Sequence, residues 1–242
     1  MKLDFKNKTI LITGGEGGIG KTISNQFLRL GAKIIVTTTK KKLVNRSTNK
    51  KIYMYLDFNN KVSIRNFLIN LKKIKKIDVL INNAGINKLG SIDEIDDAYV
   101  EKIYGVNLLG PIIMTKEISK IMIKNKNGKI INISSIFGVV GKKNRSLYSS
   151  TKFGLIGLTK STALDLAKYN ILVNSVSPGV IKTGLTKKIL SSKELKKIRS
   201  EIPLSRLGEP TDVSYLICFL CSKFNKYITG QNFLVDGGYT SK

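Results

Sequence analysis

The sequence predicts an α/β fold with a single doubly wound parallel sheet of the Rossmann type and helices on both of its faces. Short apolar runs alternate with helical segments along the whole chain. Strands that are apolar throughout are typical of a parallel sheet buried on both faces. The first run ends in a glycine-rich turn that leads into a helix, and no linker, repeat or low-complexity block interrupts the 242 residues. We therefore expect residues 1–242 to form a single domain, with a ligand crevice at the carboxyl ends of the strands.

The expected strands are short apolar runs. In chain order they cover Thr9–Thr13, Lys33–Thr37, Ile52–Leu56, Asp78–Ile81, Lys129–Ile133, Ile171–Val176 and Asn232–Val235. The expected helices show apolar residues at helical spacing. They cover Lys21–Leu30, Val62–Ile74, Asp96–Val106, Ile112–Lys124, Tyr148–Tyr169, Ser192–Ser200 and Asp212–Ser222. The first of them ends at Gly31, a residue type that commonly terminates helices.

The chain is strongly basic, with a net charge of +26 and 42 Lys and Arg residues. A charge of this size is typical of proteins that bind nucleic acid or membrane surfaces. However, only six of these residues are Arg, the type that makes bidentate contacts to phosphates and bases. The lysines fall in scattered pairs such as Lys72-Lys73 and Lys196-Lys197. We therefore interpret the charge as solvated surface and expect no nucleic-acid partner.

The sequence also predicts a cytoplasmic protein without a membrane segment or a metal site. No apolar run reaches the ~18–20 residues that cross a bilayer, and the first eight residues lead into a strand without a signal-peptide core. Cys218 and Cys221 lie three apart in an apolar helix, and the chain contains no His. We expect both to be buried helix cysteines in a reducing compartment rather than a redox or metal pair.

Tyr148 and Lys152 form the pair that points most directly to chemistry. Four residues apart on a helix, their side chains share a face. An ammonium beside a phenol lowers the phenol's pKa, and a tyrosine tuned in this way acts as a general acid or base. The alternative is an ordinary surface pair, because the chain has nine Tyr and many Lys.

The glycine-rich turn Thr13–Gly20 lies between the first strand and the first helix. Glycines allow the backbone to approach a pyrophosphate, and the helix N-terminus presents free N–H groups to it. The spacing Gly14-x-x-x-Gly18-x-Gly20 resembles that of the short-chain dehydrogenase/reductase family. Further motifs of that family follow in order over essentially all of the chain: Asn82-Asn83-Ala84-Gly85, Asn107, Ser135, Tyr148 with Lys152, Ser177–Thr183, Thr229-Gly230-Gln231 and Val235–Gly238.

The resemblance implies an active NAD(P)(H)-dependent oxidoreductase that interconverts a ketone and a secondary alcohol. Tyr148 would exchange a proton with the substrate oxygen, and Lys152 would lower the tyrosine's pKa and bind the nicotinamide ribose. Ser135 would hold the substrate oxygen and stabilise charge on it, whereas strand alternation points Ser134 the other way. Asn107, in a helix, would hold a water that links Lys152 to solvent.

The resemblance also implies a set of cofactor contacts. They are Gly14, Glu16, Gly18, Ile19, Gly20, Thr38, Asp57, Phe58, Asn83, Ala84, Gly85, Tyr148, Lys152, Pro178, Gly179, Ile181 and Thr183. The second strand is followed by Lys40-Lys41-Lys42 and ends without the carboxylate that selects NAD. NADP(H) is therefore favoured over NAD(H), although Glu16 would repel a 2′-phosphate and Gly17 replaces the Arg of many NADP-using relatives.

The overall pattern, including Pro203–Gly208, is similar to 3-oxoacyl-[acyl-carrier-protein] reductases, which implies a 3-oxoacyl thioester or another carrier-bound or small-molecule carbonyl substrate. Sugar, polyol and nucleotide-sugar oxidoreductases of surface-glycan metabolism remain an alternative, as does a non-catalytic nucleotide-binding or nucleic-acid-binding module. Of the family's two carrier-binding basic positions, Lys126 occupies one and Tyr169 replaces the other. The loop cations Lys142, Lys143 and Arg145 are either contacts to an acidic partner or solvated charges. Relatives imply a homotetramer or homodimer, consistent with the apolar stretch Val213–Leu220.

Overall fold

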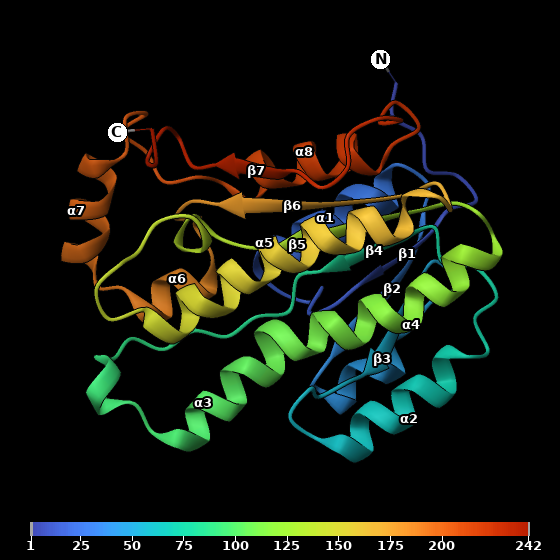
Figure 1. Ribbon diagram of the computed structural model, residues 1–242, viewed down its shortest axis with the longest axis horizontal. Coiled ribbons are helices and arrows are strands. Elements are labelled where there is room, and N and C mark those ends of the chain that lie inside the picture. Colours follow the sequence, from blue (N-terminus) through green and yellow to red (C-terminus); the bar gives the residue numbers. More distant parts are fainter. Residues whose placement is uncertain (1, 242) are drawn as a thin grey trace.

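A seven-stranded parallel sheet forms the centre of the computed structural model, which describes residues 2–241 (Figure 1). The strands are β1 (Thr9–Ile12), β2 (Lys33–Thr38), β3 (Lys51–Tyr55), β4 (Val79–Asn82), β5 (Gly128–Ile133), β6 (Ile171–Pro178) and β7 (Asn232–Val235). Their spatial order is β3-β2-β1-β4-β5-β6-β7. The order reverses direction between β1 and β4, so the crevice for a ligand opens there at the carboxyl ends of the strands. The predicted fold class is confirmed.

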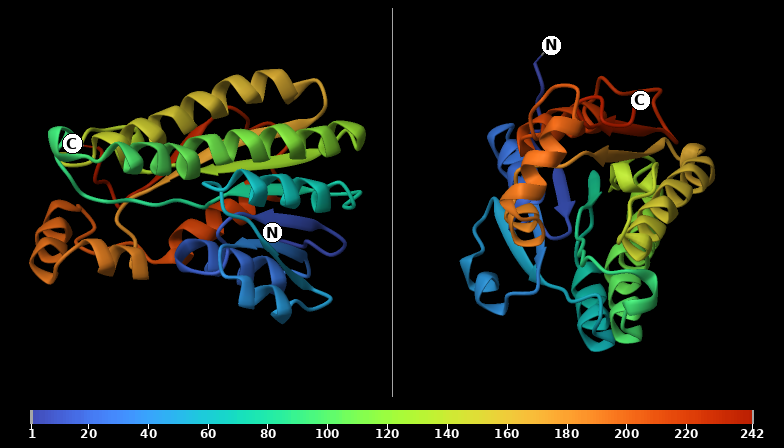
Figure 2. Two further views of the ribbon diagram at one scale, coloured as in Figure 1. Left: turned by 90° about the horizontal axis from the view of Figure 1, so that it is seen from below. Right: turned by 90° about the vertical axis from the view of Figure 1, so that its left-hand side faces the viewer.

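Helices cover the two faces of the sheet (Figure 2, left). They are α1 (Gly18–Arg29), α2 (Lys61–Leu71), α3 (Asp97–Tyr104), α4 (Gly110–Lys124), α5 (Ser146–Ala167), α6 (Gly184–Ile189), α7 (Ser192–Glu201) and α8 (Pro210–Cys221). One hydrophobic core packs α1 and α8 against one face, and a second packs α2, α4 and α5 against the other. Side chains alternate between these cores along each strand, so that Ile10 and Ile12 enter the first and Leu11 the second. This explains why the strands are apolar throughout.

The elements differ from the sequence expectation mainly next to the crevice. Helix α1 begins at Gly18 instead of Lys21, and α5 at Ser146 instead of Tyr148. Helix α6 was not among the expected elements, because its six residues are too few to show helical periodicity. The expected helix Asp96–Val106 passes into a π-helical turn at Gly105–Leu109, which connects it to α4.

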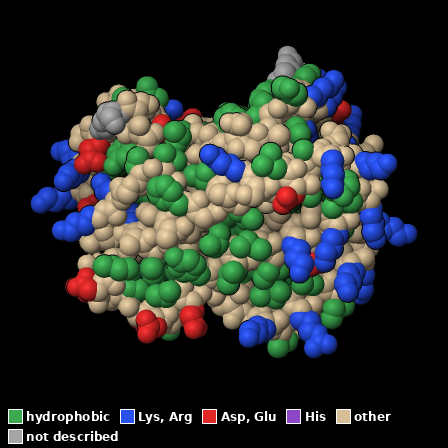
Figure 3. Space-filling model, viewed as in Figure 1, with side chains coloured by type: hydrophobic (Ala, Val, Ile, Leu, Met, Phe, Trp, Pro, Cys, Tyr) green, Lys and Arg blue, Asp and Glu red, His purple; other side chains and the backbone are tan. Residues whose placement is uncertain are grey.

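The face of the molecule shown in Figure 3 is basic along its margin. Lys and Arg side chains are spread around the margin of the face in Figure 3 rather than gathered in one band, and hydrophobic side chains gather over α4 and α5. Among the exposed hydrophobic residues of these helices are Ile112, Phe153 and Leu164. Cys218 and Cys221 are both buried in α8, as the sequence predicted. None of the helices in residues 2–241 combines the length and apolar character needed to cross a membrane.

Candidate active site

The glycine-rich turn after β1 is tied to the loop after β4 at the point where the strand order reverses. The Thr13 hydroxyl accepts hydrogen bonds from the backbone N–H groups of Asn83 (2.9 Å) and Ala84 (3.0 Å). The Asn83 amide in turn donates to the carbonyl oxygens of Thr13 (2.9 Å) and Gly14 (3.1 Å). Gly14 has a φ of +62°, and a Cβ there would lie 3.0 Å from the Cα of Ala84. The turn therefore needs glycine for both its conformation and its close packing.

Gly20 does not line the cleft; it allows close packing between α1 and the neighbouring loops. A Cβ at this position would lie 2.5 Å from Nδ2 of Asn83 and 2.7 Å from the carbonyl oxygen of Gly14. The absence of a side chain lets the first turn of α1 press against both loops, which holds the helix N-terminus at the cleft. The backbone N–H groups there have no side-chain cap from Gly17, so they are free to face an anion.

A carboxylate lies at the end of β2, and it belongs to Glu16, the residue that the sequence predicted to oppose a 2′-phosphate. Glu16, from the glycine-rich turn, accepts a hydrogen bond from the Thr38 hydroxyl at 2.5 Å and pairs with the Lys40 ammonium at 3.2 Å. Lys40 is otherwise exposed. The cation and the carboxylate thus meet where a nucleotide's adenosine ribose would bind in this fold.

The residues expected to perform chemistry converge at the carboxyl end of β5 and on α5. Ser135 follows β5 directly, is buried, and forms a side-chain hydrogen bond with Tyr148. The Lys152 ammonium donates to the carbonyl oxygen of Ile133 at 2.8 Å and lies over the Tyr148 ring, 5.5 Å from its centroid. Ser134 points elsewhere, because its hydroxyl donates to the carbonyl oxygen of Lys152 at 2.9 Å.

The protonation of this pair is controlled mainly by burial. Desolvation raises the pKa of Tyr148 above its ordinary value, and the hydrogen bond from Ser135 and the charge of Arg145 lower it by less. Burial lowers the pKa of Lys152 from 10.5 to about 8. The sequence predicted that Lys152 would lower the tyrosine's pKa, but the dominant influence in the structure has the opposite sign. The reason is that both groups lie in a low-dielectric environment that disfavours either charged form.

Asn107 lies in the π-helical turn and is completely buried. Its side chain accepts from the backbone N–H of Ile86 (2.8 Å) and donates to the carbonyl oxygen of the same residue (2.9 Å). It also donates to the Thr151 hydroxyl at 3.3 Å. A Cβ on Gly85 would lie 3.6 Å from Oδ1 of Asn107 and 3.7 Å from Nζ of Lys152. The side chain therefore fixes the loop after β4 beside Lys152, and the water that Asn107 is expected to hold stays a prediction.

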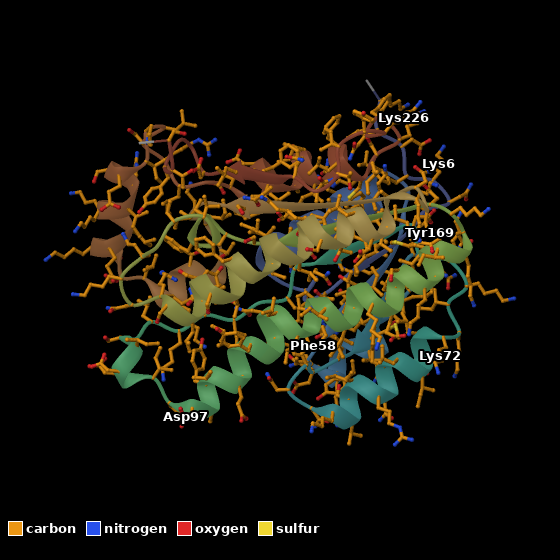
Figure 4. The ribbon with its side chains drawn as sticks, in the orientation of Figure 1. Lys6, Phe58, Lys72, Asp97, Tyr169 and Lys226 are labelled. Atoms are coloured by element: carbon orange, nitrogen blue, oxygen red, sulfur yellow. The ribbon has the colours of Figure 1, made fainter. Side chains whose placement is uncertain are left out.

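A cleft of about 1320 Å³ connects these parts. Its walls include every cofactor contact and catalytic residue expected from the sequence except Gly20 and Asn107. The Asp57 carboxylate, which follows β3, accepts a hydrogen bond from the backbone N–H of Asn59 at 2.9 Å. The ring of Phe58 lies beside α4 (Figure 4) and would collide with a Cβ on Gly110.

Sequence reasoning missed several residues of the cleft wall. Phe137 lies two residues after Ser135 in the cleft wall. The sequence did not predict it there, because a single aromatic residue outside any motif looks like an ordinary core residue. Residues 185, 186 and 188–190 belong to α6 and the segment after it, and they line the cleft next to Thr183. Thr183 caps α6 by accepting from the N–H of Thr186 at 3.2 Å. The proximity of α6 to the expected Ser177–Thr183 loop was the available signal.

Comparison with known proteins identifies the family. A family model described as Enoyl-(Acyl carrier protein) reductase matches residues 14–240. A 3-oxoacyl-[acyl-carrier-protein] reductase, FabG, of Rickettsia typhi is 39% identical over 240 residues, 98% of each chain. The chain is a short-chain dehydrogenase/reductase. The FabG protein of Aquifex aeolicus is 35% identical over 247 residues, covering 98% of this chain and 99% of its own.

Solved structures share the fold of this chain over nearly its whole length. ElxO with NADP bound superposes with a TM-score of 0.89 at 35% identity, covering 97% of this chain and 99% of ElxO. A 4-hydroxyisoleucine dehydrogenase complexed with NADH gives a TM-score of 0.90 at 35% identity, with 98% and 100% covered. The protein is an oxidoreductase that uses a nicotinamide nucleotide and acts on a CH–OH or C=O group.

Proposed function

We propose that this enzyme reduces 3-oxoacyl thioesters with NADPH, using Tyr148 as the proton donor. The observation that supports this most directly is the position of the Ser135–Tyr148 hydrogen bond, beside Lys152, in the cleft that begins at the glycine-rich turn. The similarity to 3-oxoacyl-[acyl-carrier-protein] reductases over 98% of the chain favours this substrate class.

The residues of the cleft fit a nicotinamide dinucleotide. Gly14, Gly18 and the uncapped start of α1 leave backbone N–H groups and space for a pyrophosphate, and Lys152 presents an ammonium to a ribose. When bound, the nucleotide supplies the hydride. Residues of the loop Pro178–Thr183 and of the adjoining α6 line the cleft as well, where they would shield a bound nucleotide from solvent.

The catalytic side chains orient the oxygen of the ketone and protonate it. Ser135 and Tyr148 orient it, and Tyr148 donates its phenolic proton as negative charge develops there. The raised pKa of Tyr148 keeps the phenol protonated at neutral pH, which suits the reductive direction. Lys152 replaces the lost proton, since its pKa of about 8 places proton exchange near neutrality. Asn107 positions Lys152 through the loop after β4.

The preference for NADPH follows from the charges around β2. The strand ends in threonines and is followed by three lysines, without a carboxylate of its own. ElxO, with NADP bound, is a similar structure, whereas the similar 4-hydroxyisoleucine dehydrogenase holds NADH. The Glu16 carboxylate would repel a 2′-phosphate. When NADPH binds, Lys40 must therefore leave its ion pair with Glu16 and form one with the phosphate instead.

We expect the enzyme to act in the cytoplasm as a homotetramer built on a single domain per chain. The apolar side chains over α4 and α5 support the assembly, because Leu164 is 81% and Phe153 47% exposed on the chain alone. A contiguous apolar face of this kind is typical of an interface between subunits. Sedimentation at micromolar concentration measures the state directly, and a monomer would contradict the expectation.

Tyr148→Phe tests the function, because it removes only the proton donor. Oxidation of NADPH by a 3-oxobutanoyl thioester should fall at least about a hundredfold, the usual contribution of a general acid. NADPH should still bind, as measured by calorimetry. Tyr227→Phe, which alters a tyrosine that is 97% exposed, is the matched control. A wild-type enzyme that binds NADPH but reduces no thioester would refute the substrate assignment.

A further inference from the structure

A buried guanidinium lies in the wall of the cleft at the substrate end. Arg145 immediately precedes α5 and is only 9% exposed. Its Cζ lies over the ring of Phe137, 5.0 Å from the ring centroid. Arg145, Phe137, Ser135 and Tyr148 all line the same cleft. Figure 1 shows this end of α5 at the side of the molecule where α6 and α7 lie.

Arg145 differs from the other two cations of its loop. Lys142 and Lys143 are exposed, and Lys142 forms an ion pair with Glu201 at 3.8 Å. Arg145 instead turns inward. The sequence could not separate the three residues, because charge in a loop does not reveal which side chain is buried.

The buried guanidinium has no partner of opposite charge. Within residues 2–241, no carboxylate forms an ion pair with Arg145 and no side chain or carbonyl accepts a hydrogen bond from its guanidinium. Glu194 attracts it electrostatically without forming an ion pair, since that carboxylate accepts hydrogen bonds from the N–H (2.8 Å) and hydroxyl (2.7 Å) of Ser191. Burial lowers the pKa of Arg145, which reflects this lack of compensation. A buried, unpaired charge is unfavourable unless a ligand pairs with it.

We propose that Arg145 binds an anionic oxygen group of the substrate, a carboxylate or a phosphate, so that the ketone reduced at Tyr148 belongs to an acidic molecule. The planar guanidinium can donate two parallel hydrogen bonds to either group, and its remaining face is held by Phe137. This proposal rests on the proposed function, because it assumes reduction at Tyr148. Within the thioester class, it favours short acyl chains that end in a carboxylate over plain alkyl chains.

The anionic group must lie near the reacting carbonyl. Arg145 is three residues before Tyr148, at the start of the same helix, and its charge acts on the phenol. A ligand with its charge at the far end of a long chain would not reach both groups. We therefore expect a compact substrate, with only a few bonds between the ketone and the anion.

Two matched pairs of ketones test the proposal and distinguish its two forms. Acetoacetate is compared with ethyl acetoacetate, and dihydroxyacetone phosphate with dihydroxyacetone, by following oxidation of NADPH and of NADH. The wild-type kcat/KM should be at least about tenfold higher for the charged member of one pair, the scale of a charge-assisted hydrogen bond. The pair that shows the preference identifies carboxylate or phosphate.

The variant Arg145→Gln should reduce this ratio toward one, whatever it does to the absolute rate through Tyr148. Arg145→Lys should retain part of the preference for the charged ketone, because it keeps the positive charge but cannot donate two parallel hydrogen bonds. Lys143→Gln, an exposed cation two residues away, should leave the ratio unchanged. Circular dichroism and thermal unfolding verify that each variant is folded. A loss of rate by equal factors for both members of a pair would indicate a structural role and overturn the proposal.

A binding measurement separates failure of this inference from failure of the proposed function. Malonate and phosphate are titrated by calorimetry into the enzyme saturated with nucleotide. Binding that weakens about tenfold in Arg145→Gln supports the anion site even when no ketone is reduced. Turnover of a neutral thioester that depends on Tyr148, without any preference or binding for anions, would overturn the inference and leave the proposed function intact. Absence of both turnover and anion binding would overturn both.

Discussion

Lys152→Met should make the protein more stable while abolishing its activity. Lys152 is 3% exposed, and burial lowers the pKa of its ammonium from 10.5 to about 8. Because one unit of pKa corresponds to about 1.4 kcal/mol, the protonated side chain costs the folded state about 3 kcal/mol at neutral pH. Met has a similar length and carries no charge.

The gain is reduced by the hydrogen bond that Met cannot make. The ammonium donates to the carbonyl oxygen of Ile133 at 2.8 Å, and losing a bond of this kind costs about 1 kcal/mol. The net increase in the free energy of unfolding should therefore be about 2 kcal/mol, which for a chain of this size raises the melting temperature by about 5 °C.

The pH dependence gives the sharper test. Below pH 8 the lysine is protonated in both the folded and the unfolded chain, so the full cost is present. Between about pH 8 and 10.5 the folded protein has released this proton and the unfolded chain still holds it, so the stability of the wild type rises with pH relative to Met. The advantage of the variant should consequently shrink over this range and reverse above it, where only the loss of the hydrogen bond to Ile133 remains.

Urea unfolding of the nucleotide-free protein, followed by circular dichroism at several pH values, measures both effects. Lys160→Met is the matched control, because Lys160 lies on an exposed face of the same helix, and it should change stability by less than about 0.5 kcal/mol. A Lys152→Met variant that is less stable than the wild type at pH 7, or equally favoured at pH 7 and pH 10, would show that burial of the Lys152 ammonium does not destabilise the folded protein.

Two further predictions concern the nucleotide end of the cleft. Glu16→Gln removes the carboxylate next to Thr38 and Lys40, so the Kd for NADPH should fall about tenfold while the Kd for NADH stays equal or rises. Glu117→Gln, at an exposed ion pair on α4, is the control. An unchanged ratio of the two Kd values, measured by calorimetry, would contradict this prediction. Gly20→Ala places a Cβ 2.5 Å from Asn83 and 2.7 Å from the Gly14 carbonyl, so it should lower the free energy of unfolding by about 1–3 kcal/mol and weaken nucleotide binding. Gly141→Ala, where a Cβ meets nothing within 4 Å, should be close to neutral, and equal melting temperatures for both variants would show that Gly20 is not tightly packed.

The sheet, the crevice and the reaction class could all be predicted from the amino-acid sequence. Apolar strands and periodic helices are local patterns, and they record which faces of each element are buried. The spacing from the glycine-rich turn through Ser135 to Lys152 indicated the family, because the chemistry requires these side chains at fixed positions on consecutive elements. The comparisons confirmed the family and the reaction class.

The electrostatics of the site could not be predicted from the sequence, because they depend on the packing of the folded chain. Whether Lys152 or desolvation governs the pKa of Tyr148 depends on how many atoms surround both groups, and the packing of α5 against β5 sets that number. The carboxylate at the end of β2 comes from Glu16, 22 residues away in the chain, so no pattern within β2 could reveal it. Arg145 and Lys143 are alike in sequence, yet one is buried against Phe137 and the other is exposed. The energy of a charge depends on its dielectric surroundings and its neighbours in space, and both are properties of the folded chain rather than of a local segment.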